Sequence, residues 1–482
     1  MTDLKTLFPG MELPKTAVSS VTSDSRKACP GSLFVALRGF STDGHLYAAD
    51  AYRRGCRLFA LEHAVPLPED ALQIVVKDTT ELLPSLAATF YGRPADKLHV
   101  IGITGTKGKT SSALMLYHIL NACGILAGYI GTLGVWYKDH KQKTANTTPD
   151  PLTLHSAMRK MVDEGVKVLV LEVSSQSVPA RRIDGIKLFA AGLTNLYPDH
   201  VGPGEHPSLA EYYDAKVSIV CDYGAEHVLV SEEVFDVIAK DRIARPFTTF
   251  GMKDECDIRA FNVTSSDSTR LPGEQFTVGK TSFTLPVPGL FSVRNALLAI
   301  GMARILGLSD AQIANALHSV CIPGRMEGYV LPGGALAVID YAHNGESLSQ
   351  ALSSLSPLCR GKLLCLVGSV GGRTQIRREE IGQAAATLCN KLILTSDNPD
   401  FEDPAAICRE IEQAARKCSS TLPVTIITER EEAIRKTVAG MRPSDVLLLA
   451  GKGHEDYQLI KGEKIPFSER QILLSVGAVP AV

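Results

Sequence analysis

The sequence predicts an α/β protein of three domains that ends in a Rossmann-like, doubly wound sheet. With 482 residues, the chain is too long for a single hydrophobic core and matches about three domains of ordinary size. Near residue 100, a β-branched apolar run is followed by a glycine-rich loop and a helical pattern. Beyond residue 324, apolar runs alternate with helical stretches, as they do in mostly parallel sheets.

Composition indicates a globular cytoplasmic protein. Hydrophobic residues make up 45% of the chain and charged residues 21%, which allows substantial hydrophobic cores. No apolar run approaches the roughly 20 residues that span a bilayer, and no basic segment precedes an apolar stretch at the start, so we expect no membrane partner. A net charge of −2 offers no general attraction for nucleic acid. The 11 cysteines form no C-x-x-C pair, so we expect buried thiols.

Two turns divide the chain into the three predicted domains. The first turn lies near Tyr91 to Pro94, after a region in which short apolar runs alternate with loops as in a small α/β unit. The second is Pro323 and Gly324, where we expect a hinge because ligands bound to different domains require domain closure. The predicted domains are therefore residues 1–96, 97–323 and 324–482.

A phosphate-binding loop is the strongest single motif. Thr104 to Thr110 (TGTKGKT) follows a buried-looking strand, Leu98 to Ile103, and precedes a helical pattern. It resembles a P-loop that lacks one residue of the usual G-x-x-x-x-G-K-[ST] spacing. Its glycines let backbone N–H groups face phosphates, Lys109 supplies positive charge, and the Thr110 hydroxyl can bind Mg²⁺. The second domain is therefore predicted to be a P-loop ATP-binding domain; the alternative is a tight glycine turn between strand and helix.

Acidic residues follow two further strands of the same domain. Glu172 follows the apolar run Val166 to Leu171, so its carboxylate should emerge at the sheet edge that carries the P-loop. A second magnesium ligand belongs at this position. Asp199 and His200 follow another buried-looking run and could also reach a metal, although a structural histidine is the alternative for His200. Oxygen ligands and phosphate favour Mg²⁺ over zinc.

The third domain is predicted to bind a ligand at one edge of its sheet. In doubly wound sheets, ligands lie beyond the carboxyl ends of the strands. Those ends carry Asp340, Gly368, Asp397 and Gly451. The predicted strands are Leu336–Ile339, Leu363–Val367, Lys391–Leu394, Val424–Ile427 and Val446–Leu449.

Six segments, in order along the chain, resemble the motif series of the Mur ligases. They are Gly105–Thr110, Glu172–Ser175, Thr194–Leu196 with Asp199–His200, Gly289–Asn295, Pro323–Glu327 and Asp340–His343. Segments around Ser25 and His45 resemble the N-terminal UDP-binding domain of the family member that adds the third amino acid to its precursor. Asp397–Pro399 and Gly451–Glu455 resemble amino-acid-binding segments of that member. The resemblance therefore spans nearly the whole chain.

The resemblance implies a ligase that uses ATP and Mg²⁺ to join UDP-MurNAc-L-Ala-D-Glu to a free amino acid, and we expect a monomer. ATP would phosphorylate the terminal carboxylate of the precursor, and the amine would attack the acyl phosphate to form an amide. The implied catalytic residues are Lys109, Glu172, His200 and Lys216. The implied Mg²⁺ ligands are Thr110, Glu172, His200 and Lys216, the last as a carbamate. From the residues alone, Lys216 is a lysine on a helix surface.

Family positions also imply three groups of binding residues. Those for ATP are Gly105, Thr106, Lys107, Gly108, Lys109, Thr110, Ser111, Asn295, Arg325, Asp340 and His343. Those for the UDP precursor are Ser25, Arg26, His45, Asn146, Thr147, Thr148, Ser174 and Arg182. Those for the amino acid are Asp397, Asn398, Asp400, Gly451 and Glu455. Simpler explanations are a helix cap for Asn295, a surface charge for Arg325 and a disordered loop for residues 146–149.

Several positions depart from the family pattern. Gln176 stands where the family has His, Ser292 where it has Asn, and Asn344–Gly345 where it has Thr-Pro. Gly371–Thr374 replaces a Gly-Asp-Arg-Asp sequence, and Pro203–Gly204 lengthens a loop. None of these changes removes a phosphate or metal ligand, so we expect activity. The alternatives are a catalytically silent nucleotide-binding relative and a folylpolyglutamate synthase-like ligase, which lacks the N-terminal UDP-binding region.

Position 400 bears on which amino acid is added. Family members that add meso-diaminopimelate have Arg after Asp-Asn-Pro, and its guanidinium binds the distal carboxylate in bidentate fashion. Here Asp400 follows Asp397 to Pro399. An acid would repel a distal carboxylate and attract a distal ammonium, which favours L-lysine, or L-ornithine, over meso-diaminopimelate. A solvated Asp400 without a contact is the alternative.

Overall fold

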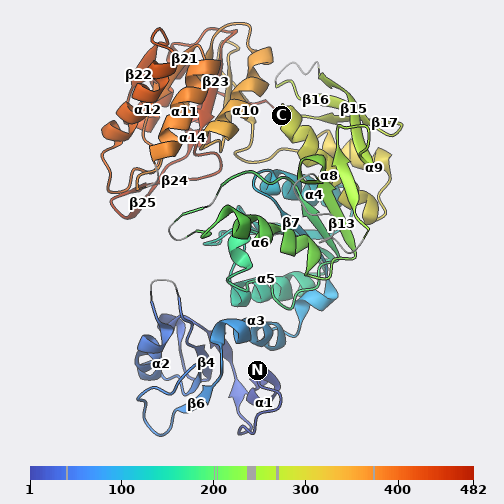
Figure 1. Ribbon diagram of the computed structural model, residues 1–482, viewed down its shortest axis with the longest axis vertical. Helices are drawn as coiled ribbons and strands as arrows, with labels where there is room; N and C mark the ends of the chain where they lie inside the picture. The colour runs from blue at the N-terminus through green and yellow to red at the C-terminus, as the bar shows by residue number, and fades with distance from the viewer. Residues whose placement is uncertain are drawn as a thin grey trace. The chain divides into compact units, whose positions relative to one another are not determined.

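The computed structural model describes residues 1–39, 42–199, 201–202, 205–235, 246–266, 271–372 and 375–481 (Figure 1). The chain divides into two compact units. The first consists of Met1–Asp257 and Gly301–Gly307, and the second of Ile258–Ile300 and Leu308–Val482. The domain boundaries expected at residues 96 and 323 stay a prediction. No helix in the described ranges is long and apolar enough to cross a membrane.

The first unit begins with a small α/β sheet. Its four strands are parallel and lie in the order β3-β4-β5-β6. Every residue of β4 and β5 is buried, as expected for apolar strands of a parallel sheet covered on both faces. α3 begins where the Asp78 carboxylate accepts hydrogen bonds from the Thr80 and Glu81 backbone N–H groups. The elements are β1 (Thr2–Asp3), α1 (Leu4–Leu7), β2 (Ala17–Val18), β3 (Ser20–Thr22), η1 (Ser25–Lys27), β4 (Ser32–Val35), η2 (Gly44–Tyr47), α2 (Ala48–Arg53), β5 (Leu58–Leu61), β6 (Leu72–Val75), α3 (Thr79–Phe90) and η3 (Pro94–Lys97).

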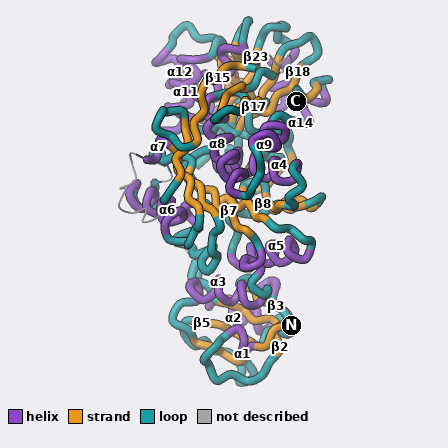
Figure 2. The backbone as a smooth tube through the Cα atoms, turned by 90° about the vertical axis from the view of Figure 1, so that its right-hand side faces the viewer, coloured by secondary structure: helices purple, strands orange, loops and turns teal. Residues whose placement is uncertain are grey.

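A mainly parallel sheet forms the centre of the first unit. Its parallel strands lie in the order β8-β11-β7-β12-β13-β14, and β9 and β10 extend it by antiparallel pairing. Figure 2 shows β7 and β8 of this sheet between α4 and α5. α4 packs on β8 and β11, and α6 packs on β7 and β12. β7 and β11 end at the same edge, as predicted, with Thr104 and Glu172 as their last residues. The elements are β7 (His99–Thr104), α4 (Lys109–Ala122), β8 (Ala127–Gly131), β9 (Gly134–Tyr137), β10 (His140–Gln142), α5 (Pro151–Asp163), β11 (Val168–Glu172), η4 (Ser175–Ser177), β12 (Ala190–Leu193), α6 (Leu209–Cys221), β13 (His227–Ser231), α7 (Glu232–Phe235) and β14 (Thr248–Gly251).

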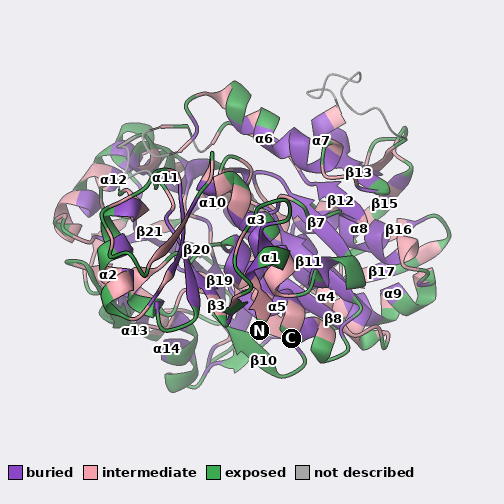
Figure 3. Cartoon of the chain, turned by 90° about the horizontal axis from the view of Figure 1, so that it is seen from below, coloured by how far each residue is buried: buried purple, intermediate pink, exposed green. Residues whose placement is uncertain are grey.

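The second unit contains an antiparallel sheet and a doubly wound sheet. β15 (Ile258–Ser265), β16 (Glu274–Val278) and β17 (Thr281–Leu285) pair antiparallel. The larger sheet has the order β22-β21-β20-β23-β19-β18-β26, in which β18 pairs antiparallel with both β19 and β26 and the remaining pairs are parallel. β23 lies between β19 and β20, so the sheet is doubly wound, and all five predicted strands are present. Every residue of β19, β20 and β23 is buried, and Figure 3 shows β20 in the colour of buried residues.

The remaining elements of the second unit connect these sheets or cover them. α8 crosses from the second unit into the first at Gly301. α11 packs against both α10 and α12. The elements are α8 (Leu290–Ile305), α9 (Asp310–Leu317), β18 (Glu327–Val330), β19 (Leu336–Asp340), α10 (Gly345–Leu355), η6 (Ser356–Leu358), β20 (Leu363–Val367), α11 (Gln375–Leu388), β21 (Lys391–Leu394), α12 (Pro404–Cys418), β22 (Val424–Ile426), α13 (Arg430–Ala439), β23 (Val446–Ala450), β24 (Tyr457–Ile460), β25 (Glu463–Pro466), α14 (Glu469–Ser475) and β26 (Val479–Pro480).

Candidate active site

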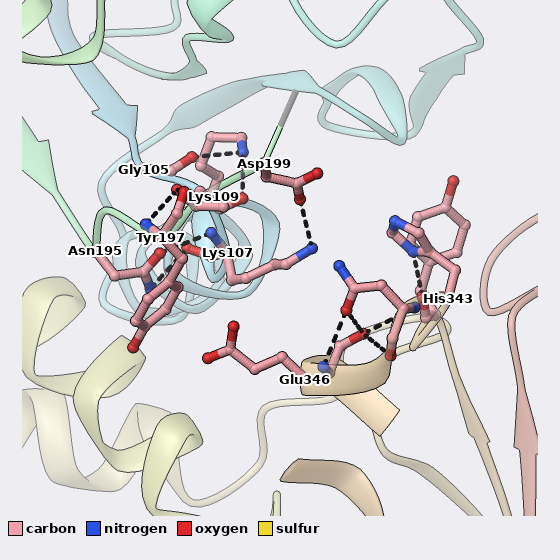
Figure 4. Close-up of polar contacts among 12 residues, drawn as sticks. Gly105, Lys107, Lys109, Asn195, Tyr197, Asp199, His343 and Glu346 are labelled. Carbon is pink, nitrogen blue, oxygen red and sulfur yellow. Dashed lines mark hydrogen bonds and ion pairs between the residues drawn. The ribbon is translucent and has the colours of Figure 1, made fainter. Parts of the chain in front are cut away.

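The predicted P-loop joins β7 to α4. Gly105 and Gly108 have φ angles of 140° and 82°, which favour glycine. A Cβ on Gly105 would lie 1.9 Å from the Thr194 hydroxyl oxygen, so no side chain fits there. The Lys109 ammonium donates hydrogen bonds to the carbonyls of Gly105, at 2.8 Å, and Thr106, at 3.1 Å (Figure 4). Lys109 therefore lies over the loop whose phosphate ligand it is predicted to contact.

The segment after β12 holds this loop in place. The Thr106 N–H donates to the Asn195 backbone carbonyl at 3.0 Å, and the Lys107 N–H donates to the Asn195 side-chain carbonyl at 2.8 Å. The Thr194 hydroxyl donates to the Lys107 carbonyl at 2.6 Å. The Lys107 ammonium pairs with the Asp199 carboxylate at 3.1 Å (Figure 4). The roles of Thr194 and Asn195 were not predicted, although the motif Thr194–Leu196 marked the segment.

Glu172 is a fully buried carboxylate that accepts four hydrogen bonds. Its Oε1 accepts from the Tyr129 hydroxyl and from the Thr132 N–H at 3.1 Å. Its Oε2 accepts from the hydroxyls of Thr110, at 2.8 Å, and Thr132, at 3.1 Å. Gly131 permits this approach, because a Cβ there would lie 2.3 Å from Oε1. A carboxylate beside the P-loop threonine is an oxygen donor set that suits Mg²⁺.

Lys216 is buried beside the P-loop, so a helix-surface position is wrong. The residue is 1% exposed, and its ammonium donates to the Gly105 carbonyl at 2.7 Å. Burial, and then the charge of Lys109, hold the pKa of Lys216 well below its ordinary value. Within the described residues, no group of three or more His, Cys, Asp or Glu side chains could hold a metal. His200, another predicted ligand, lies outside the described residues.

Three predicted precursor-binding residues meet beside Glu172. The Thr148 hydroxyl donates to the Glu172 backbone carbonyl and accepts from the Ser174 N–H, both at 2.9 Å. The Arg182 guanidinium donates to the Thr148 carbonyl at 2.9 Å. Asn146 is exposed and Thr147 half-buried on the same loop. The buried Thr148 fixes this loop to the sheet edge, which contradicts the disordered-loop explanation.

The predicted uridine-diphosphate residues Ser25, Arg26 and His45 lie in two short 3₁₀ helices of the small sheet. The exposed Arg26 guanidinium binds the Asp24 carboxylate through hydrogen bonds of 2.9 and 3.0 Å. His45 is buried, with Nδ1 2.6 Å from the Asp43 carboxylate and Nε2 accepting from a backbone N–H at 2.9 Å. Arg26 can exchange its exposed ion pair for a phosphate, whereas both ring nitrogens of His45 are already engaged.

In the second unit, three predicted nucleotide-binding residues gather at the end of β19. Asp340, its last residue, accepts a hydrogen bond from the Met326 N–H at 2.8 Å. Burial raises the pKa of Asp340. The Arg325 guanidinium lies 4.7 Å from the centre of the Tyr341 ring, and His343 Nδ1 lies 2.8 Å from the Tyr341 carbonyl oxygen. The chain therefore brings Arg325, Asp340 and His343 together around Tyr341, a residue that was not predicted.

One alternative explanation and one expectation from the sequence are wrong. Asn295 is buried within α8, several residues from its start, so it is not a helix cap. Only Cys56, Cys365, Cys389 and Cys408 are buried, whereas Cys29, Cys321 and Cys418 are exposed and the other four are half-buried. The cysteine side chain is small, so it can lie at a helix end or beside a loop without being in the core. The number of cysteines in the chain therefore overestimates the number that are buried.

The predicted amino-acid-binding residues lie after β21 and β23, around a lysine whose role was not predicted. Lys452 is fully buried, and its ammonium donates to the Asn398 side-chain carbonyl at 2.8 Å. It pairs with the carboxylates of Glu455, at 2.8 Å, and Asp397, at 3.4 Å. Burial is the largest effect and opposes ionisation of Glu455, but the charge of Lys452 and the hydrogen bonds from Lys452 and Asn398 together hold the pKa of Glu455 below its ordinary value. Gly451 follows β23 with a φ of 106°.

Asp400 caps a turn and leaves one carboxylate oxygen available. Its φ of 52° is left-handed, a conformation that Asp adopts more readily than most residues. Oδ1 accepts a hydrogen bond from the Gly462 N–H at 2.7 Å in the turn between β24 and β25. The described residues give Oδ2 no hydrogen-bond partner. Asp400 therefore contacts its own turn through Oδ1, and Oδ2 can meet a ligand.

Gly324→Ala should destabilise the second unit by at least about 2 kcal/mol. Gly324 has a φ of 67°, and a Cβ there would lie 2.1 Å from the His454 backbone nitrogen. Gly333→Ala is the matched control, because its φ of 97° is also left-handed but no atom lies within 4 Å of its Cβ position. Urea unfolding should show a smaller loss, about 1 kcal/mol, for the control. Equal losses of unfolding free energy in the two variants would show that glycine is needed at position 324 for its backbone angle alone, and not for the close approach of His454.

Family sequence models match three stretches of the chain. The description "Mur ligase family, catalytic domain" matches residues 17–91, and "Mur ligase middle domain" matches residues 103–303. "Mur ligase, glutamate ligase domain" matches residues 324–453. One match falls within each of the three predicted domains.

Similar proteins extend over nearly the whole chain. The UDP-N-acetylmuramoyl-L-alanyl-D-glutamate--2,6-diaminopimelate ligase of Caldanaerobacter subterraneus subsp. tengcongensis is 35% identical over 469 residues, 96% of each chain. The protein of the same name from Chlorobaculum tepidum is 36% identical over 484 residues, 95% of this chain and 92% of that one. A solved structure with this enzyme name has a TM-score of 0.69 at 24% identity, covering 98% of both chains, which confirms the three-domain α/β fold. The chain belongs to the Mur ligase family.

Proposed function

We propose that this chain adds the third amino acid to UDP-MurNAc-L-Ala-D-Glu in an ATP-dependent ligation. Its family consists of ATP-dependent carbon–nitrogen ligases, and relatives that cover nearly all of the chain are named for this precursor. One observation carries the proposal. Thr148, which joins the predicted precursor residues Ser174 and Arg182, also hydrogen-bonds the backbone of Glu172 beside the P-loop. The carboxylate to be activated and the phosphates of ATP can thus be bound next to each other.

Two group transfers complete the proposed reaction. A carboxylate oxygen of the precursor attacks the γ-phosphorus of ATP, forming an acyl phosphate and releasing ADP. The amine nitrogen then attacks the acyl carbon, the C–O bond to phosphate breaks, and the amine loses a proton as amide and phosphate form. The P-loop N–H groups and Lys109 hold the phosphates and stabilise charge in the first transfer. Mg²⁺, for which Thr110, Glu172 and His200 are the proposed ligands, would neutralise phosphate charge.

We also propose that Lys216 is carbamylated and joins the Mg²⁺ ligands. An ammonium beside Mg²⁺ would be repelled, whereas a carbamate supplies negatively charged oxygen ligands. Its position supports this, because Lys216 is buried and its Nζ lies 2.7 Å from the Gly105 carbonyl of the P-loop. Carbon-13 NMR of protein equilibrated with labelled CO₂ should show a carbamate signal that Lys216→Arg abolishes. A spectrum without that signal would contradict the modification.

The amino acid that we propose is L-lysine, or L-ornithine, because Asp400 Oδ2 can meet a distal ammonium. The names of the relatives favour 2,6-diaminopimelate instead. The test offers each amino acid separately, with ATP, Mg²⁺ and UDP-MurNAc-L-Ala-D-Glu, and follows product mass and phosphate release. A lysine or ornithine product supports the ligation and the role of Asp400, and a meso-diaminopimelate product contradicts only the choice of amino acid. Absence of any product would favour a silent relative or a folylpolyglutamate synthase-like ligase.

Asp400→Asn should raise the KM for L-lysine about fivefold and leave the KM for ATP unchanged. Asparagine tolerates the left-handed backbone, and its side-chain oxygen can still accept from the Gly462 N–H, so only the charge is removed. With meso-diaminopimelate, the same variant should have a lower KM, because a repulsion is removed. Initial rates with each amino acid measure both changes. An unchanged KM for both amino acids would show that Asp400 serves only the turn.

A further inference from the structure

Side chains from three segments hold the Glu455 carboxylate by both oxygens. Oε2 accepts hydrogen bonds from the Lys452 ammonium at 2.8 Å and from the Asn398 amide at 3.0 Å. Oε1 accepts from the Tyr341 hydroxyl at 3.2 Å. A carboxylate oxygen has about two acceptor sites, so within the described residues Oε1 keeps one of its sites and Oε2 keeps none. Oε1 is therefore the oxygen that can accept a hydrogen bond from an incoming amine.

The Tyr341 ring is fixed by both the nucleotide-facing and the amino-acid-binding segments. Its centre lies 5.0 Å from the ring centre of His343 and 4.9 Å from that of His454. The Arg325 guanidinium lies 4.7 Å from the ring centre, within the range of a cation–π interaction. Gly453 approaches so closely that a Cβ on it would lie 2.7 Å from the Tyr341 Cβ. The hydroxyl position thus depends on Arg325 and His343 as well as on the loop after β23.

We propose that Tyr341 is a positioning residue for the incoming amine and acts through Glu455. Its hydroxyl orients Oε1, the oxygen with an acceptor site left for the amine. Because Arg325 and His343 contact the same ring, nucleotide bound to those residues would steady the orientation of Glu455. The inference rests on the proposed function, since it assumes that Glu455 binds the amino acid. It adds a residue that links the nucleotide-facing side of the second unit to the amino-acid site.

The test is Tyr341→Phe, which removes the hydroxyl and keeps the ring contacts. The KM for the amino acid should rise about tenfold, as expected when a hydrogen bond to a charged group is lost. The KM for ATP should stay within about twofold, and the melting temperature should fall by no more than about 4 °C, because one hydrogen bond is lost while the packing of the ring is kept. Equal increases in both KM values together with a larger fall in melting temperature would show a structural role and overturn the proposal. An unchanged KM for the amino acid would also overturn it.

A double-mutant cycle shows whether Tyr341 acts through Glu455. If it does, Tyr341→Phe should have little further effect on the amino-acid KM in a Glu455→Gln background, whereas additive effects would contradict the proposal. Tyr329→Phe is the matched control, because the Tyr329 hydroxyl also donates to a glutamate, Glu327, at 2.5 Å. It should leave the KM for the amino acid unchanged.

Failure of the proposed function and failure of the proposed role of Tyr341 give different results. Wild-type protein that forms no amide with any of the three amino acids would overturn the proposed function. Active wild-type protein with an unaffected Tyr341→Phe variant would overturn the role of Tyr341 alone.

Discussion

Lys109→Met should lower the rate of ADP formation by about two to four orders of magnitude. Lys109 lies at the P-loop with its ammonium 2.8 Å from the Gly105 carbonyl, where it can move onto a phosphate. Its charge is needed most in the transition state, when negative charge moves between the phosphoryl group and ADP, so the loss should appear in kcat. The free energy of unfolding should fall by about 1 kcal/mol, since two hydrogen bonds to loop carbonyls are lost.

The matched control is Lys138→Met. Lys138 is not a predicted site residue and forms an exposed pair with Glu164 at 2.6 Å. Steady-state ADP release should be the same for this variant and the wild-type protein, and the free energy of unfolding should change by less than about 1 kcal/mol. If Lys109→Met kept the wild-type rate, another cation would have to hold the transferred phosphoryl group, and the P-loop assignment would be wrong.

Arg430→Met should destabilise the second unit by about 3–5 kcal/mol, the largest stability effect that we expect. Arg430 is fully buried and donates to Glu469 Oε1 through Nε and Nη2, at 2.9 and 2.7 Å. It also donates to the backbone carbonyls of Ser396, at 3.2 Å, and Ala450, at 2.7 Å. Removing the guanidinium leaves a buried carboxylate and two backbone carbonyls without this donor. Urea unfolding followed by circular dichroism measures the loss.

The double variant Arg430→Met with Glu469→Leu should recover much of this stability. The double variant removes both charges from a buried site. There, the free-energy cost of desolvating an isolated ion pair exceeds the electrostatic attraction between its charges. Arg435→Met is the surface control, because Arg435 pairs with Glu431 at 2.8 Å on an exposed helix face and should contribute less than about 1 kcal/mol. A loss below 1 kcal/mol for Arg430→Met alone would mean that water reaches Glu469 and replaces the guanidinium.

Local patterns in the sequence were sufficient to predict features that a single short pattern defines. The P-loop was predictable because strand, glycine loop and helix are consecutive, and Glu172 because an acid follows a buried strand. The antiparallel strands β16 and β17 were not predicted, although buried Phe276 and Val278 alternate with more exposed residues in the period of a half-buried strand. That alternation is the signal that could have found them.

Contacts between distant segments explain what the sequence could not show. Tyr129 meets Glu172 from 43 residues away, and Tyr341 meets Glu455 from 114 residues away. Nothing in the local pattern of either tyrosine indicates a polar partner. Lys452 is a further case, because lysine is usually exposed, and only the folded loops reveal that it is buried between Asn398 and Glu455. Roles that depend on such partners need the structure.

The most direct test of the proposed ligation follows oxygen from the precursor into phosphate. UDP-MurNAc-L-Ala-D-Glu labelled with ¹⁸O in the carboxylate that becomes the amide is incubated with ATP, Mg²⁺ and the amino acid that gives product. One of the two carboxylate oxygens, both of which carry ¹⁸O, bridges carbon and phosphorus in the acyl phosphate, and the other stays in the amide. We therefore expect one ¹⁸O atom in inorganic phosphate for every amide formed, as measured by mass spectrometry. Unlabelled phosphate released together with amide would contradict an acyl-phosphate intermediate, and the absence of amide would contradict the ligation itself.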